Sequence, residues 1–118
     1  MIVAQLPWPP SNLRPNAARR RHYMANAKDA AAYKALCSIA LRSQGIGKVE
    51  AERVAVTLRF CPPRRGRMDR SGTLAAFKAG EDALAEAIGV DDDEFEPITL
   101  CRGEPVKGGA VIVEVTEQ

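Results

Sequence analysis

Apolar side chains alternate with polar or small ones in two stretches of the chain. Along residues 53–60 the apolar set is Val54, Val56, Leu58 and Phe60, and residues 110–116 show the same alternation. A period of two is typical of a strand with one buried face. Residues 2–6 and 95–101 add two further apolar stretches, which end before Pro7 and before Arg102-Gly103. The pattern therefore predicts four strands.

Helical spacing appears in two other stretches. Asn26 can cap a helix that ends near Gly45, and its apolar residues are Tyr33, Leu36, Cys37, Ala40 and Leu41. A second helix is expected over residues 71–88, capped by Ser71, and its apolar stripe is Leu74, Phe77, Leu84 and Ile88. Gly89 is expected to end it. Residues 11–25 show no periodicity and indicate an arginine-rich loop.

These elements follow the order β-α-β-α-β-β. We expect an α+β fold in which two helices pack on a small mixed or largely antiparallel sheet. The 118 residues have the length of one ordinary domain, and neither a repeat nor a long linker divides residues 1–118. No apolar run approaches the length of a membrane span, and the first residues lack the features of a signal peptide. We therefore expect a cytoplasmic protein with no membrane partner.

Charge is distributed unevenly along the chain, although the net charge is only +2. Residues 1–70 contain 14 Lys or Arg and 4 Asp or Glu, whereas residues 71–118 contain 3 and 11. The basic residues include two arginine clusters, namely Arg14, Arg19, Arg20 and Arg21, then Arg64, Arg65, Arg67 and Arg70. A planar guanidinium suits phosphate oxygens. The pattern is compatible with a nucleic-acid-binding surface, although charged runs are often only solvated.

Candidate chemistry is concentrated in carboxylates. Asp91, Asp92, Asp93 and Glu94 follow the second helix, where they form either a solvated turn or a seat for a divalent cation. Asp69 stands before that helix, inside the basic loop. The single histidine, His22, lies in an arginine-rich loop without the partners of a catalytic triad.

Two segments together resemble a known family. The N-terminal LPWPPSNLRPNAARRRHY and the later RRGRMDR…AAFKAGEDALAEAIGVDD are similar to the RusA-type Holliday junction resolvases, especially phage-encoded ones. The resemblance spans nearly the whole chain. It implies a homodimeric endonuclease that cuts four-way DNA junctions with Mg²⁺, in recombination or repair.

The resemblance also implies roles for particular residues. Asp69 matches the first aspartate of a D-x-D-N motif, Asp91 and Asp92 match an acidic pair after the helix, and Lys78 matches a catalytic lysine. The three aspartates would hold the metal. DNA phosphates would be contacted by Arg19, Arg20, Arg21, Arg64, Arg65, Arg67 and Arg70. The chain departs from the motif where Ser71 and Gly72 replace Asp and Asn. This departure leaves open a protein that binds branched DNA without cutting it, or one whose acidic turn is only solvated.

The expected helix sets a geometric condition on such a site. Eighteen residues in one straight helix span about 27 Å. Asp69 and Asp92, at its two ends, would then be too far apart to share an ion with ligand distances of about 2.1 Å. A late helix start with a folded exit loop would resolve this, as would a homodimer that pairs Asp69 of one chain with Asp92 of the other.

Overall fold

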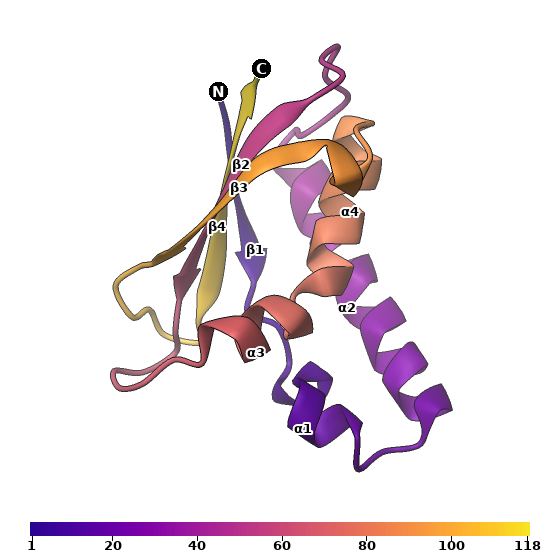
Figure 1. Ribbon diagram of the computed structural model, residues 1–118, viewed down its shortest axis with the longest axis vertical. Coiled ribbons are helices and arrows are strands. Elements are labelled where there is room, and N and C mark those ends of the chain that lie inside the picture. Colours follow the sequence, from indigo (N-terminus) through magenta and orange to yellow (C-terminus); the bar gives the residue numbers. More distant parts are fainter.

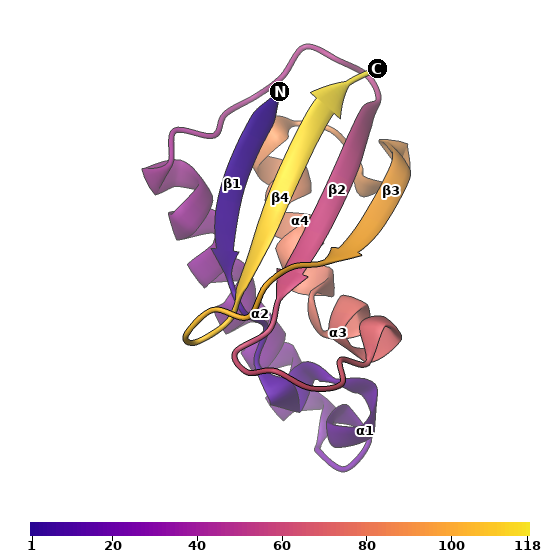
Figure 2. The ribbon, with the colours of Figure 1, turned by 90° about the vertical axis from the view of Figure 1, so that its left-hand side faces the viewer.

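The computed structural model describes residues 1–118 and shows a four-stranded mixed sheet (Figure 1). The strands are β1 (Ile2–Pro7), β2 (Val54–Cys61), β3 (Phe95–Arg102) and β4 (Ala110–Glu117). They lie in the order β1-β4-β2-β3 (Figure 2). β4 pairs antiparallel with β1 and β2, whereas β2 and β3 are parallel. The α+β fold, the four strands and the mixed sheet are thus confirmed.

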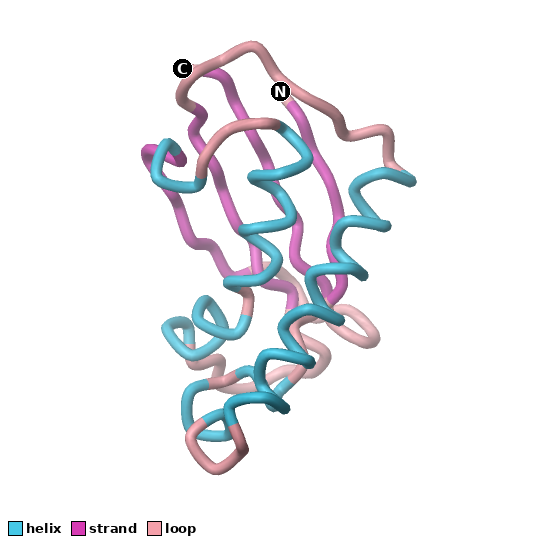
Figure 3. The backbone as a smooth tube through the Cα atoms, turned by 90° about the vertical axis from the view of Figure 1, so that its right-hand side faces the viewer, coloured by secondary structure: helices cyan, strands magenta, loops and turns pink.

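Two long helices cover one face of this sheet. They are α2 (Tyr23–Ser43) and α4 (Lys78–Ile88), which pack against each other (Figure 3). The inward set of β2, which the alternation predicted, is fully buried beneath them. Neither helix, nor any other in the chain, is apolar over a length sufficient to cross a membrane.

Aromatic rings join the helices to the sheet. Phe60 on β2 contacts Trp8 and Phe77 edge to face, with ring centroids 6.2 Å and 5.9 Å apart. Tyr33 on α2 contacts Phe77 in the same way and donates a hydrogen bond from its hydroxyl to Pro7 O at 2.6 Å. This bond satisfies a buried phenol and ties α2 to the end of β1.

The segment before α2 is more helical than its sequence suggests. Two short elements, η1 (Ser11–Leu13) and α1 (Pro15–Ala18), occupy the expected loop. α2 also begins earlier than predicted, because His22 rather than Asn26 is its N-cap: His22 Nδ1 accepts from Met24 N–H at 3.2 Å. Tyr33, Cys37 and Leu41 are buried as expected, but Leu36 lies on the exposed side of the helix.

The second helix is broken, which corrects the expectation of one straight helix over 71–88. α3 (Arg70–Ala76) and α4 are separate elements joined at Phe77. The Phe77 ring is fully buried and folds back over Gly80, where a Cβ atom would lie only 2.4 Å from it. The missing side chain of Gly80 therefore makes room for the ring. Gly89 ends α4 with a φ of 73°, as predicted.

Candidate functional site

Asp69 is the N-cap of α3, a role that the sequence assigned to Ser71. Its carboxylate accepts from Gly72 N–H at 3.2 Å, which satisfies one of the free amides at the helix start. A Cβ atom on Gly72 would lie 2.5 Å from Asp69 Oδ2. A larger residue at position 72 would displace the Asp69 carboxylate, so the position of this carboxylate depends on Gly72.

Two clefts meet beside this helix start. The Asp69 cleft, of about 490 Å³, is lined by Arg14, Arg20, Asp69 and Ser71 among others. The arginine cleft, also about 490 Å³, is lined by Trp8, Arg14, Arg64, Arg65 and Arg67 among others. Arg14 and Ser11 line both clefts, so the two are contiguous. Because η1 and α1 both contact α3, the fold brings two basic segments about fifty residues apart to one end of the molecule.

The predicted DNA-contacting arginines are not all equally available. Arg20 lines the Asp69 cleft and is exposed, as is Arg19. Arg21 instead forms an ion pair with Asp29 on α2 and so contributes to the local fold. Arg70 is exposed as the first residue of α3. Arg102, which the sequence analysis did not select, donates a hydrogen bond to Gly66 O in the basic loop.

The acidic run forms a tight turn after α4. Asp91 caps the short helix η2 (Asp92–Glu94), and its side chain accepts from Asp93 N–H at 3.0 Å. Carboxylate oxygens of Asp91, Asp92 and Asp93 all lie within 4.8 Å of one another. Glu94 faces away from this group, since it pairs with Arg53 at 3.1 Å.

Lys78 lies between two carboxylates at this turn. Its ammonium group contacts Asp92, and it is 3.1 Å from Asp82 Oδ1, one helical turn further along α4. The hydrogen bond to Asp92 is the main cause that raises the pKa of Lys78 above its usual range, and the same bond lowers the pKa of Asp92. Both groups are therefore charged at neutral pH.

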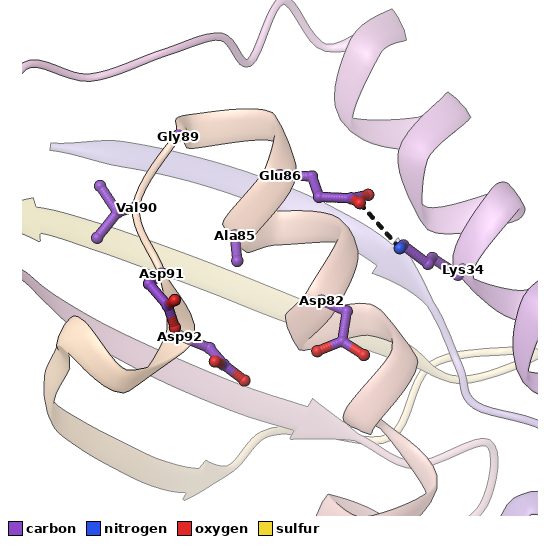
Figure 4. A pocket seen from close by; sticks show the side chains of 8 residues that line it. All are labelled: Lys34, Asp82, Ala85, Glu86, Gly89, Val90, Asp91 and Asp92. Carbon is purple, nitrogen blue, oxygen red and sulfur yellow. Dashed lines mark hydrogen bonds and ion pairs between the residues drawn. The ribbon is translucent and has the colours of Figure 1, made fainter.

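Asp82, Asp91 and Asp92 share a shallow cleft of about 410 Å³, called here the acidic cleft (Figure 4). Lys34 on α2 and Glu86 on α4 also line this cleft and form an ion pair at 3.0 Å (Figure 4). Sequence reasoning missed Asp82, although its spacing of four residues from Lys78 on a helix places the two side chains together.

Within one chain, the structure groups only part of the predicted metal set. Asp91 and Asp92 lie side by side, with Lys78 on Asp92, whereas Asp69 lines a different cleft among arginines. The chain thus presents an acidic cleft and a basic pair of clefts, linked by the broken α3–α4 segment. The three-aspartate site stays a prediction.

Comparison with known proteins finds a relative in Xylella fastidiosa. The chain is 31% identical over 114 residues to an uncharacterized protein of Xylella fastidiosa strain Temecula1. The alignment covers 94% of this chain and 73% of that protein. No protein-family model matches the chain.

Proposed function

This chain belongs to the same family as the Xylella fastidiosa protein, and we propose that it is a Mg²⁺-dependent endonuclease of the RusA type. Its substrate would be branched DNA, four-way junctions in particular, within recombination or repair, and it would act in the cytoplasm. The observation that carries the proposal is a set of arginines from two distant segments that line contiguous clefts beside Asp69, namely Arg14, Arg20, Arg64, Arg65 and Arg67.

A polyanion explains these clefts better than a small ligand does. The exposed arginines present several guanidinium groups over an open surface, which suits repeated phosphates along a backbone. Phosphate contacts position DNA without reading its sequence, as a protein selective for shape requires. Trp8, which lines the arginine cleft, packs on Phe60 and therefore acts as an anchor of this surface.

The donor chemistry of the acidic cleft fits Mg²⁺. This ion binds through one or two carboxylates plus waters and substrate phosphate, and Asp91 and Asp92 supply adjacent carboxylates. A bound Mg²⁺ would lower the pKa of a water molecule and offset charge on the scissile phosphate. Lys78 keeps its proton beside Asp92 and would place a second positive charge near that phosphate. Asp69 lines a different cleft of its own chain and would reach this ion from the second chain of a homodimer, in the pairing of Asp69 with Asp92.

A second candidate function is branched-DNA binding without cleavage. Ser71 supports it, because a neutral hydroxyl stands beside Asp69 where the resolvase motif has a carboxylate.

We further propose a homodimer, because symmetric cutting of a four-way junction requires two equivalent sites.

Binding and cleavage of one labelled four-way junction separate these functions. The endonuclease is expected to bind the junction in EDTA more tightly than a linear duplex of the same arm sequence. It is expected to cut the junction only after Mg²⁺ is added. Selective binding with no cleavage over a wide range of Mg²⁺ concentrations would favour the second function. Equal affinity for junction and duplex would contradict both.

Ser71→Asp is expected to increase Mg²⁺ affinity several-fold and to raise the cleavage rate. If Asp69 of one chain meets Asp92 of the other, the new carboxylate beside Asp69 would give the shared ion both a further charge and a direct oxygen ligand. Ser71→Asn is the matched control, since it has the same size without the charge. Mg²⁺ titration by calorimetry measures the gain, and equal affinities for the two variants would contradict this role of position 71.

Adding Gly72→Asn to Ser71→Asp should not improve the site further. A side chain at 72 collides with Asp69 Oδ2 and would displace the cap of α3. We expect the double variant to lose about 0.5–2 kcal/mol of stability relative to Ser71→Asp, the usual cost of a lost N-cap. Urea unfolding measures this difference. Equal stability of the two variants would show that Asp69 can retain its cap beside a larger residue.

A further inference from the structure

Two aromatic rings are exposed at the start of α2, and they are called here the aromatic pair. Tyr23 has 74% of its surface accessible, whereas Tyr33 on the same helix has 2% and packs on Phe77. The Tyr23 ring lies beside the ring of His22, which is exposed as well, with centroids 4.5 Å apart and planes inclined at 31°. Neither ring belongs to the buried core, so packing of the fold does not explain the pair.

The corner between α1 and α2, from which the aromatic pair projects, lies at one end of the molecule and is held by side-chain contacts (Figure 1). Asn26 Nδ2 donates to Ala18 O at 2.8 Å and so ties the first turn of α2 to α1. Asp29, on the next turn of α2, accepts from Asn12 Nδ2 on η1 at 2.9 Å and pairs with Arg21. The aromatic pair therefore stands on an ordered support, which reduces the entropy lost when a ligand binds.

The aromatic pair follows the exposed arginines of the basic surface. Arg20 lines the Asp69 cleft, and Arg19 before it is exposed. Tyr23 comes three residues after Arg20, so their Cα atoms are at most about 11 Å apart. A DNA strand advances about 3.4 Å per nucleotide, so a strand whose phosphate contacts Arg20 can reach the Tyr23 ring within about three nucleotides.

A nucleobase is the ligand that suits an aromatic ring beside phosphate-binding groups. Proteins that bind single strands combine basic groups along the backbone with aromatic rings on which bases stack. His22 lies along one side of the Tyr23 ring, and the exposure of Tyr23 leaves its other side open. Inside a duplex both faces of a base are covered by its neighbours, so only an unpaired base can stack there. Such stacking tolerates any sequence, because every base has a π-face.

We infer that the aromatic pair is a stacking site for an unpaired base of branched DNA, in which Tyr23 contacts the base and His22 lies along the other side of the Tyr23 ring. The inference rests on the proposed function and adds a base contact to the phosphate contacts of the arginines. Bases at a branch point can lose a stacking neighbour, whereas those of a continuous duplex keep both. The site therefore contributes to the preference for a junction over a duplex.

Tyr23→Leu is expected to lower the affinity for a labelled four-way junction in EDTA about tenfold, which is within the range for loss of one base–aromatic stack. Affinity for a linear duplex of the same arm sequence should not change. Tyr23→Phe keeps the ring and should bind the junction like wild type. Fluorescence anisotropy measures these affinities. An equal loss on junction and duplex would overturn the inference.

Leu36→Ala is the matched control for this variant. Leu36 is a large exposed apolar residue on the same helix, thirteen residues and about 20 Å beyond Tyr23. It lines neither basic cleft, and its loss should leave DNA binding unchanged. If Leu36→Ala weakens junction binding as much as Tyr23→Leu does, the effect is not specific to the aromatic pair and the inference is overturned.

A junction that lacks bases at its branch point tests the contact directly. With abasic nucleotides in place of those next to the branch point, wild type should bind about tenfold more weakly than it binds the intact junction. Tyr23→Leu should lose nothing further on the abasic junction, because the ring and the base act as one pair. If Tyr23→Leu weakens binding to both junctions by the same factor, the ring does not contact these bases and the inference is overturned.

The outcomes separate this site from the proposed function. If Tyr23→Leu binds the junction as tightly as wild type and cuts it with Mg²⁺, only the stacking site is overturned, and the aromatic pair would be assigned to a protein contact instead. If wild type itself binds junction and duplex with equal affinity, the proposed function is contradicted and the stacking site with it.

Discussion

Asp92→Asn is expected to lower Mg²⁺-dependent junction cleavage by about a hundredfold or more while junction binding stays close to wild type. Loss of a group that only supports a metal ligand already costs about 10–100-fold, and Asp92 is proposed as a ligand itself. Asparagine keeps the shape and one oxygen but removes the charge. Cleavage is measured under single-turnover conditions at saturating protein, and junction affinity is measured in EDTA. Together they separate a loss of cleavage rate from a loss of DNA binding.

The fold should tolerate this change. Asp92 lies on a short surface turn, and its ion pair with Lys78 is partly exposed to solvent, so we expect the pair to add little to stability. Lys78 lowers the pKa of Asp92, so what the pair contributes is present at neutral pH and is lost only as the pH falls through that lowered value. A urea unfolding curve at neutral pH close to wild type would show that lost activity reflects the site.

Asp93→Asn is the matched control, with the same charge change one residue away. Asp93 is exposed, so its carboxylate is expected to be solvated. We expect less than about a threefold effect on cleavage, as is usual for a surface substitution outside a site. If the two variants lose activity equally, all three carboxylates act together. If neither loses activity, the acidic cleft is not where cleavage occurs.

The fold was predictable where local patterns decide the structure. The alternation along β2 reflects one buried face, and Phe60 and Val56 lie where it places them. The break at Phe77 was not predictable, because helical spacing continues through it. It depends on the ring of Phe77 lying over Gly80, a tertiary contact that no local pattern records.

In the candidate site, too, the sequence shows the local clusters but not the contacts that the fold makes between them. The acidic run and the two arginine clusters could be found in the sequence because they are contiguous. The sequence does not show that the two arginine segments lie together, because Arg14 joins the clefts only after η1 and α1 pack on α3. Asp69 was correctly placed before the second helix, but its role as the cap depends on the absence of a side chain at Gly72.

Removing the arginines that line the contiguous clefts should produce the largest loss of DNA affinity. The variant with Arg14, Arg20 and Arg65 changed to Ala takes positive charge from both clefts and leaves the Arg21–Asp29 ion pair intact. If each arginine contacts one phosphate, the slope of log affinity against log salt should fall by about 0.9 per arginine, roughly 2.7 in all. Binding to junction and to duplex should both weaken, because phosphate contacts carry no sequence information.

The control must remove the same charge from elsewhere. Arg42, Lys48 and Lys107 are exposed and line neither cleft, so their triple alanine variant loses three charges outside the proposed surface. Fluorescence anisotropy over a salt series measures affinity and slope for both variants. A general effect of net charge would lower the two slopes alike and would contradict a localised surface. A flattened slope in the cleft variant alone would mean that DNA contacts the end of the molecule where η1, α1 and the basic loop meet, beside Asp69.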